Sequence, residues 1–129
     1  MPLMQFDVIE GRSEAEMKAI LDVTHQAVLD VFKVPERDRY QIVYEHKPAN
    51  MIFEDTGLGF ERTKDLIMLR IFTSPRAEEQ KLEFMKTLAE ELEQKCGVKG
   101  TDLMMSFFTN TRHDWSFAHG EAQYFTGAL

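Results

Sequence analysis

Residues 3–34 read LMQFDVIEGRSEAEMKAILDVTHQAVLDVFKV, and this stretch decides the fold. Apolar side chains at every second position of residues 3–9 predict a strand that ends before Gly11. Ser13 followed three residues later by Glu16 fits a capping box, so a helix is expected to begin here. The helix is expected to bury one face, on which residues recur at three- and four-residue steps: Met17, Ile20, Leu21, Thr24, Val28 and Val31.

The same order of elements returns later in the chain. Pro35 ends the first helix by restricting the backbone before it, and alternating Tyr40, Ile42 and Tyr44 predict a second strand. Residues 66–72 and 103–108 are again strand-like. Between them a second helical stripe is formed by Leu82, Met85, Leu88, Ala89 and Leu92.

A shift of 64 residues superposes the two halves, with Arg12 on Arg76 and Asp38 on Asp102. The chain is therefore predicted to be a single domain, residues 1–129, built from two fused β-α-β units at about 2–47 and 66–109. We expect an α+β fold with a four-stranded, mainly parallel-paired sheet and two helices on one face. Because apolar residues alternate with equally apolar neighbours, an oligomer is expected to cover the other face of the sheet.

Two segments lie outside the repeat. Residues 48–64 contain turn-forming glycines and are expected to form a loop carrying a short strand. The C-terminal tail, residues 110–129, is unusually aromatic and needs a surface to pack on: it contains Trp115, Phe117, Tyr124 and Phe125.

Composition narrows the possible functions. With 15 Lys and Arg against 22 Asp and Glu, the formal net charge of −7 disfavours nucleic acid and anionic membrane as partners. The 43% of hydrophobic residues excludes a disordered chain. A single cysteine, Cys96, allows no internal disulfide and no structural zinc site, so a cytoplasmic location is expected. No transmembrane segment or signal peptide is recognisable.

Pro2 is the first candidate for chemistry. Removal of Met1 would leave a secondary amine at the start of the chain. An ordinary α-amino group has a pKa of roughly 7.7–8.0, so burial turns it toward a general base and a neighbouring carboxylate turns it toward a general acid. The alternative is an ordinary proline at the start of a strand.

Two arginines and two aspartates occupy equivalent places in the repeats. Arg12 and Arg76 each follow a strand and precede a helix, where a guanidinium can grip a carboxylate at two points; the alternative is a solvated charge. Asp38 and Asp102 can each organise the turn into a strand. The four histidines lack metal-ligand spacing and the Gly57–Gly59 turn is too short for a dinucleotide, so neither metal nor cofactor is expected.

Several separated motifs resemble one known group of enzymes. They are Pro2 at the start of a strand, IEGRS at 9–13, PERDRYQI at 35–42, EDTGLGF at 54–60, DWSF at 114–117 and AQYFTG at 122–127. Together with the doubled β-α-β unit they resemble the tautomerase superfamily, and the whole chain is most similar to its fused, two-unit malonate semialdehyde decarboxylase branch. The opening also resembles the short, single-unit oxalocrotonate tautomerases.

The resemblance implies a homotrimer that acts on a small oxo acid without a cofactor. It assigns the catalytic amine to Pro2, a polar, water-activating carboxylate to Asp38 and the substrate-carboxylate arginine to Arg76. The remaining residues implied are the walls of the pocket: Trp115, Phe117, Tyr124 and Leu129.

One residue differs from the decarboxylase pattern, so the resemblance leaves more than one reaction possible. The decarboxylases carry a second arginine two places before the first, where this chain has Ser74, which we interpret as a helix cap before Pro75. Decarboxylation, with hydratase side activity, is the first hypothesis, and keto–enol tautomerisation of phenylpyruvate-like substrates is the alternative. A non-catalytic, ligand-binding β-α-β module is the second alternative, and a protein-binding patch formed by the tail aromatics is a further idea.

Overall fold

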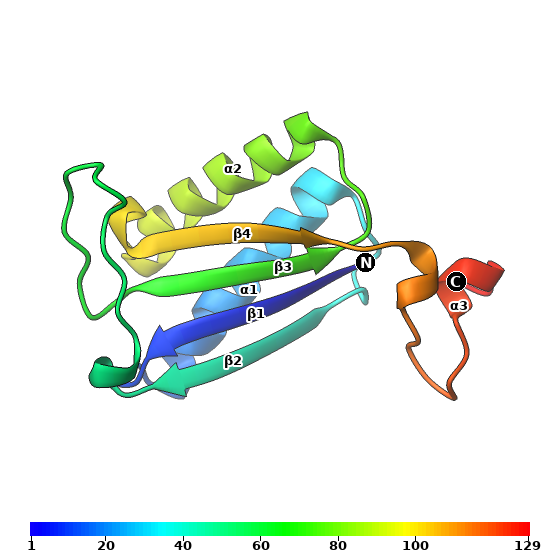
Figure 1. Cartoon of the computed structure of the whole chain (residues 1–129), viewed down its shortest axis with the longest axis horizontal. Helices are drawn as coiled ribbons and strands as arrows, with labels where there is room; N and C mark the ends of the chain where they lie inside the picture. Colours follow the sequence, from blue (N-terminus) through cyan, green and yellow to red (C-terminus); the bar gives the residue numbers. More distant parts are fainter.

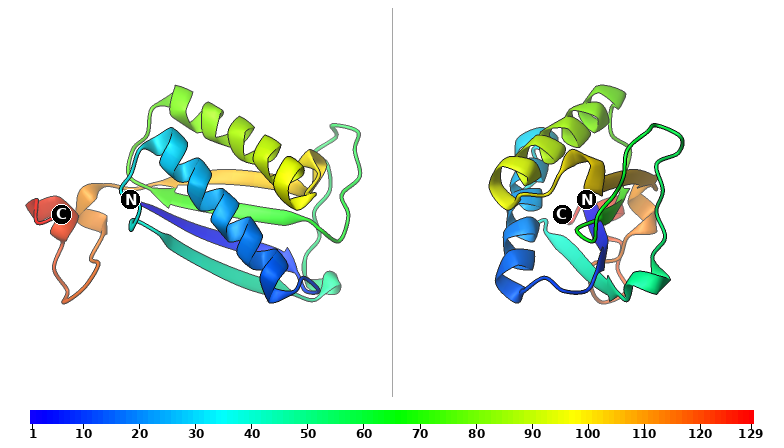
Figure 2. Two further views of the ribbon diagram at one scale, coloured as in Figure 1. Left: turned by 180° about the vertical axis from the view of Figure 1, so that it is seen from behind. Right: turned by 90° about the vertical axis from the view of Figure 1, so that its left-hand side faces the viewer.

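The computed structural model describes residues 1–129 and consists of one twisted sheet with two long helices lying side by side on one face (Figures 1 and 2). The four strands and two long helices follow the predicted order: β1 Pro2–Ile9, α1 Glu14–Phe32, β2 Tyr40–His46, β3 Ile67–Thr73, α2 Glu78–Cys96 and β4 Leu103–Thr109. The tail adds a short helix that was not predicted, α3 Gln123–Thr126. Three short 3-10 helices complete the chain: Pro48–Asn50, Gly100–Asp102 and Arg112–Asp114.

The sheet has the strand order β2-β1-β3-β4. β1 pairs with β2 in parallel, β3 pairs with β4 in parallel, and the two units meet where β1 and β3 run antiparallel. The predicted α+β class, with two fused β-α-β units and both helices on one face, is confirmed. Because the central pair is antiparallel, the start of β1 and the end of β3 lie at the same end of the sheet, with Pro2 opposite Thr73.

Local signals set the helix boundaries. The Ser13 hydroxyl accepts a hydrogen bond from the Glu16 amide at 3.1 Å, and the Glu16 carboxylate accepts one from the Ser13 amide at 2.9 Å, so the predicted capping box is confirmed. α1 ends at Lys33, whose left-handed backbone (φ 55°) turns the chain toward β2.

The core lies between the sheet and the two helices. Phe6 of β1 and Phe84 of α2 are fully buried, and the ring of Phe84 stacks on Phe32 at 5.0 Å between centroids. Leu82, predicted to belong to the buried stripe, is 57% exposed. Leu88 and Leu92 of the same predicted stripe are buried, together with Phe84, which was not predicted. Leu82 lies away from this buried face because each residue turns the helix by about 100°.

The face of the sheet opposite the helices is uncovered within one chain and mixes apolar with polar side chains. It carries a central polar cluster in which Asp7 accepts hydrogen bonds from Arg70 at 3.0 Å and pairs with His46 at 2.8 Å. Around this cluster lie large side chains that are more than one third exposed: Tyr40, Ile42, Tyr44, Met104 and Phe108.

The loop between β2 and β3 contains no strand, so that prediction is wrong. A tight turn replaces it, because the Asp55 carboxylate accepts hydrogen bonds from the amides of Gly57, Gly59 and Phe60 at 2.7–3.2 Å. The tail extends beyond the opposite end of the sheet, where it ends in α3 (Figure 1). Neither long helix has the length and hydrophobicity of a membrane span.

Candidate active site

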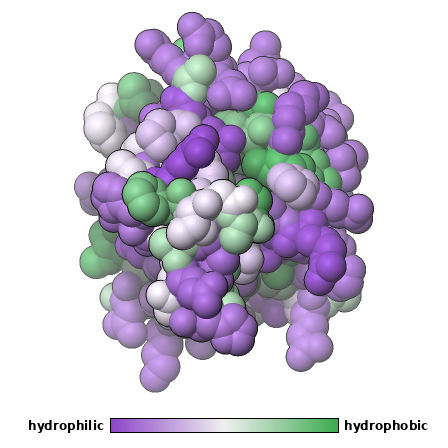
Figure 3. Space-filling model, turned by 90° about the vertical axis from the view of Figure 1, so that its right-hand side faces the viewer, coloured by the Kyte–Doolittle hydropathy of each residue, from purple (hydrophilic) through white to green (hydrophobic).

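The candidate site lies at the end of the sheet where β1 and β2 begin and β3 and β4 end, next to the tail (Figure 1). The strand pairing brings three distant parts of the sequence to this end: the start of the chain, Asp38 just before β2, and Arg76 just after β3. In the space-filling view of this end, apolar patches are surrounded by hydrophilic residues (Figure 3). This mixture suits a ligand with an apolar body and a charged group.

Asp38 is the most unusual polar residue of the molecule. Its side chain is only 4% exposed, and neither carboxylate oxygen has a hydrogen-bond partner. The nearest positive group is the amine of Met1, 3.9 Å from Oδ2. Burial raises the pKa of Asp38 above its ordinary value, and the positive charges of the amine, Arg76 and His25 oppose that rise. A buried, unpartnered carboxylate of this kind is typical of functional sites.

The pKa of the chain-terminal amine is also shifted by burial and by nearby charged groups. Burial lowers the pKa of the Met1 amine from its ordinary 8.0, Arg76 lowers it further, and Asp38 acts in the opposite direction. Pro2 itself is buried directly behind it at the start of β1. An amine in this position therefore changes its protonation state more readily near neutral pH than an exposed one.

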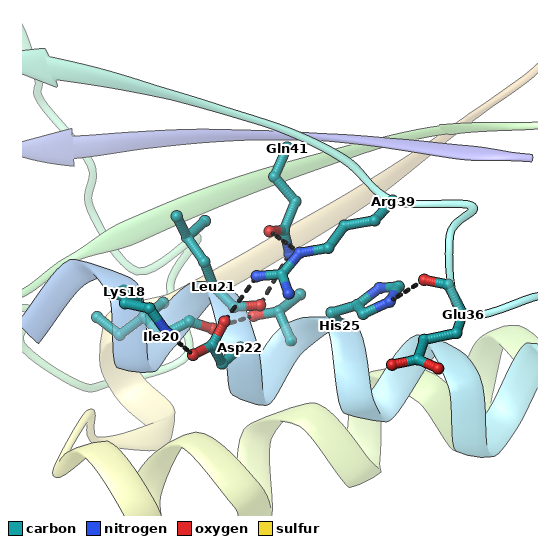
Figure 4. Close-up of polar contacts among 9 residues, drawn as sticks. Lys18, Ile20, Leu21, Asp22, His25, Glu36, Arg39 and Gln41 are labelled. Atoms are coloured by element: carbon teal, nitrogen blue, oxygen red, sulfur yellow. Dashed lines mark hydrogen bonds and ion pairs between the residues drawn. The ribbon is translucent and has the colours of Figure 1, made fainter. Parts of the chain in front are cut away.

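The loop that carries Asp38 is fastened to α1 (Figure 4). The buried His25 ring lies 2.8 Å, through Nε2, from the carbonyl oxygen of Glu36. On the other side of Asp38, the Arg39 guanidinium binds the Asp22 carboxylate at 2.8 Å. These contacts fix the backbone on both sides of a carboxylate that has no anchor of its own.

Arg76 makes a hydrogen bond through only one of its three side-chain nitrogens. Its Nε donates to the Thr73 hydroxyl at 3.2 Å, and its guanidinium packs over the ring of Phe32 at 5.1 Å. It forms no ion pair within 4.0 Å. The terminal nitrogens are therefore available for a two-point contact with a carboxylate.

Ser74 is not a helix cap, so that interpretation is wrong. The N-cap of α2 is Ala77, and the Ser74 hydroxyl instead lies 3.3 Å from the phenolic oxygen of Tyr124. Ser74 lies three positions before this N-cap and so is not at the start of the helix. Ser74 thus links the end of β3 to the tail.

A cavity of about 370 Å³ opens beside the amine and Asp38. Its lining is mostly apolar and consists of Met1, Pro35, Arg37, Asp38, Tyr40, Tyr124 and Leu129. Sequence reasoning named Asp38, Tyr124 and Leu129 but missed Pro35, Arg37 and Tyr40. The missed residues lie within three positions of Asp38 in the sequence, which is the signal that could have found them.

Trp115 and Phe117, also named as walls, lie one layer behind the cavity. Phe117 stacks on Tyr40 at 5.6 Å and Trp115 stacks on Phe117 at 5.8 Å. The Trp115 indole is held by a hydrogen bond to the Asn110 side chain at 2.8 Å. The two rings therefore support the wall formed by Tyr40 rather than lining the cavity themselves.

No other cavity combines a buried carboxylate, the chain-terminal amine and a mostly apolar lining. A wider one of about 490 Å³ lies in the loop between β2 and β3, but it is open and its lining includes Glu54, Asp55 and Glu61. Asp55 there is already occupied by backbone amides, which hold its pKa below the ordinary value. No group of three or more His, Cys, Asp or Glu side chains is arranged to hold a metal ion.

Comparison with known proteins identifies the family. A family model described as "Tautomerase enzyme" matches residues 38–118, and a second with the same description matches residues 2–61. The chain belongs to the tautomerase family. A probable tautomerase of Bacillus subtilis (strain 168), YrdN, is 53% identical over the full length of both chains. A second probable tautomerase of that organism, YusQ, is 29% identical and covers 95% of this tautomerase and 98% of its own length.

Solved structures narrow the branch. This tautomerase superposes on malonate semialdehyde decarboxylase, solved in wild-type, mutant and inactivated forms, with a TM-score of 0.96 and 43% identity over 98% of both chains. Another malonate semialdehyde decarboxylase, inhibited by 3-bromopropiolate, gives 0.94 and 39% over 98% of this chain and 97% of the other. The predicted malonate semialdehyde decarboxylase-like branch is confirmed.

Family membership also decides the general class of function. The chain is an enzyme of the tautomerase superfamily, either a decarboxylase or a tautomerase, and not the non-catalytic ligand-binding module considered as an alternative. A fused 4-OT, described as a symmetric trimer, shares the fold with a TM-score of 0.75 at 18% identity over 92% of this chain and 94% of its own.

Proposed function

We propose that this enzyme decarboxylates a small 3-oxo acid without a cofactor, using the amine of Pro2 after Met1 has been removed. The observation that carries the proposal is the buried carboxylate of Asp38, which has no hydrogen-bond partner and lies 3.9 Å from the chain-terminal amine. The unpaired guanidinium of Arg76 acts on both groups. The 43% identical malonate semialdehyde decarboxylase supports the choice of reaction.

The proposed chemistry is electrostatic. Arg76 holds the substrate carboxylate, and the protonated Pro2 amine faces the 3-oxo oxygen. The bond between the carboxylate carbon and C2 breaks, CO₂ leaves, and the electron pair forms an enolate whose oxygen the amine stabilises. A proton delivered to C2 then gives the aldehyde or ketone. Because the walls are apolar, this charge stabilisation is stronger than it would be in water.

Asp38 has two parts in this proposal. Its negative charge opposes the lowering of the pKa that burial and Arg76 cause at the chain-terminal amine, and so favours the cationic form that the enolate needs. Its free oxygens can also accept a proton from water, which is the step required for hydration of an activated alkene. The decarboxylase and hydratase activities named for the 43% identical relative are consistent with this double role.

Keto–enol tautomerisation of phenylpyruvate-like substrates is the second candidate. It is favoured by the bond between Ser74 and Tyr124, which occupies the position where the decarboxylases carry a second arginine. The aromatic stack behind Tyr40 suits a phenyl ring, and burial of the amine favours the neutral base. The 53% identical relative is called a probable tautomerase.

We also propose that the enzyme is a homotrimer in the cytoplasm. The uncovered apolar face of the sheet supports self-association, and the fused 4-OT of the same fold is described as a symmetric trimer. The single unpaired Cys96 supports a reducing compartment. The net charge of −7 argues against nucleic acid and anionic membrane as partners.

The proposal is tested by measuring acetaldehyde release from malonate semialdehyde and decay of the phenylpyruvate enol, after intact mass has established whether Met1 is present. Pro2→Ala is expected to lower turnover about 100-fold or more, since proton transfer by a positioned group contributes about 10²–10⁴. Pro48→Ala, at the distant 3-10 helix, is the control and keeps turnover within about twofold.

The outcomes separate the candidates. Aldehyde release that depends on Pro2 supports decarboxylation, whereas enol decay without aldehyde release replaces it by tautomerisation. Full activity in protein that retains Met1 would falsify amine catalysis, because the nitrogen of Pro2 is then an amide.

A further inference from the structure

The arginines of this chain fall into two groups. Those away from the cavity each donate to an acceptor oxygen of a carboxylate or a backbone carbonyl, and they are Arg12, Arg39, Arg62 and Arg70. The three at the cavity end, Arg37, Arg76 and Arg112, contact neither. In a chain with seven more acidic than basic residues, three guanidinium groups without an acid partner at one end are unexpected.

Arg37 is the member of this group that faces the cavity from its outer side. It is exposed, lines the cavity and makes no hydrogen bond or ion pair. Arg39, two residues further on, is tied to Asp22 and Gln41 at 2.8 Å. These two arginines of one loop thus differ, because Arg37 lines the cavity and Arg39 binds Asp22 of α1.

We propose that the cavity binds an oxo acid with a carboxylate at each end, with Arg76 holding the inner carboxylate and Arg37 the outer one. The inner half of this assignment rests on the function proposed above. Arg37 lines the cavity itself, and Arg76 acts on the two charged groups of its lining, the amine and Asp38. The apolar part of the wall includes Pro35, Tyr40 and Leu129, which suit the carbon chain of such a substrate. Malonate semialdehyde, a monoanion, fills only the inner half.

The position of Asp38 explains why the second carboxylate belongs at the opening. Asp38 lies inside the cavity with its oxygens unpartnered, so a second anion beside it would be repelled at low dielectric. At the opening, Arg37 offers a charge-assisted hydrogen bond in a partly solvated place. An apolar substrate end would instead displace water from the Arg37 guanidinium without offering a hydrogen bond in return, which is unfavourable.

The test measures binding without turnover. Trp115 is the only tryptophan and stacks, through Phe117, on the Tyr40 wall, so its fluorescence reports occupancy of the cavity. The full-length enzyme is titrated with glutarate, a dicarboxylate, and with butyrate, a monocarboxylate of similar length, and calorimetry gives the same constants independently of emission. Wild type is expected to bind glutarate about tenfold more tightly, as one charge-assisted hydrogen bond allows.

Three variants locate the preference. Arg37→Gln is expected to bind glutarate and butyrate within about twofold of each other. Lys33→Asn removes a positive charge from the same loop outside the cavity, keeps a residue that tolerates the left-handed backbone, and retains the tenfold preference. Arg76→Gln weakens both ligands. Because Arg37 is exposed, the preference should decrease between 50 and 300 mM salt.

Equal affinity of wild type for the two ligands overturns the proposal, and so does a preference that survives Arg37→Gln. These results are independent of the proposed function. If the preference for glutarate depends on Arg37 but turnover does not depend on Pro2, the dicarboxylate site stands and the proposed amine mechanism is wrong. If turnover depends on Pro2 but the enzyme shows no preference for glutarate, the mechanism stands and the dicarboxylate site is wrong.

Discussion

Asp38 and Arg76 lie at one end of the sheet, and their repeat counterparts, Asp102 and Arg12, lie at the other end. Asp102 is 1% exposed and accepts hydrogen bonds from the amide and the hydroxyl of Thr63, both at 2.6 Å. Arg12 donates to the carbonyl oxygen of Asp65 at 2.5 Å. Asp38 has no such partners, and Arg76 donates only to a hydroxyl.

The connection between the two units causes this difference. The loop between β2 and β3 runs past the second end, where Thr63 donates to both carboxylate oxygens of Asp102. There the carbonyl of Asp65 accepts a hydrogen bond from Nη2 of Arg12, whose Nη1 is buried without a partner. At the first end the Met1 amine lies 3.9 Å from Asp38, and no amide or hydroxyl of the chain binds either carboxylate oxygen. Asp102 and Arg12 are therefore tied to the connecting loop, whereas Asp38 has no hydrogen-bond partner and Arg76 donates only to Thr73.

The largest expected effect separates the two arginines. Arg76→Gln should lower kcat/KM about 100-fold, because removing one partner of a desolvated charge pair costs about 2–5 kcal/mol. Arg12→Gln should leave kcat/KM within about threefold, since its contact is with the loop between β2 and β3. Steady-state kinetics on both variants checks the contrast. Equal losses in the two variants would mean that the ends do not differ in function.

The two aspartates should differ in stability. Asp102→Asn should lower the free energy of unfolding by about 3 kcal/mol and Tm by about 10 °C, because it weakens two buried, charge-assisted hydrogen bonds. Asp38→Asn should leave Tm at pH 7 unchanged or raise it. The pKa of Asp38 is raised in the folded state, so its contribution to stability is present below pH 3.8 and is lost as the pH rises through the folded-state value.

Thermal denaturation of both variants at pH 7 and pH 4 measures this difference. The advantage of Asp38→Asn over wild type should shrink at pH 4, because the raised pKa of Asp38 makes its carboxyl gain a proton more readily in the folded state as the pH falls. A fall in Tm at pH 7 as large as that of Asp102→Asn would contradict the unpartnered state of Asp38.

A smaller effect is expected on the pH dependence of turnover. The pKa of the terminal amine is lowered by burial and Arg76 and raised by Asp38. Asp38→Asn should therefore move the amine-dependent limb of the kcat/KM profile to lower pH, and Arg76→Gln should move it to higher pH. Shifts in the same direction would contradict opposite electrostatic roles for the two side chains.

The smallest expected effect concerns the loop that carries Asp38. His25→Ala removes the contact with the Glu36 carbonyl and should cost about 1 kcal/mol of stability and about threefold in kcat/KM. The repeat counterpart in α2 is Ala89, which cannot make this contact. His113→Ala, on the exposed tail, is the control. If both variants behave like wild type, the His25 contact does not position Asp38.

Much of the fold was predictable because its signals are local. The capping box at Ser13 and the alternation of residues 3–9 depend only on neighbours in the sequence. The errors arose where longer-range contacts win. Leu82 was assigned to the core although Phe84 fills it, and residues 48–64 were given a strand although the Asp55 turn holds part of that loop.

The candidate site was predictable only in part. Family resemblance named Pro2, Asp38 and Arg76, but from the repeat alone Asp38 and Asp102 were equivalent and Arg12 matched Arg76. The partners of Asp102 and Arg12 are Thr63 and Asp65, which belong to the loop between β2 and β3, outside the repeat. The arginine at the opening, Arg37, carried no signal beyond its place next to Asp38, because an exposed charge in a loop is ordinary.

The sequence by itself determined two β-α-β units, their boundaries and the apolar second face of the sheet, because hydrophobic periodicity and capping act over a few residues. The tertiary structure decided which aspartate and which arginines are left without partners. That outcome depends on the antiparallel pairing of β1 with β3, which brings the start of the chain beside Asp38 and Arg76 at one end and sends the connecting loop to the other.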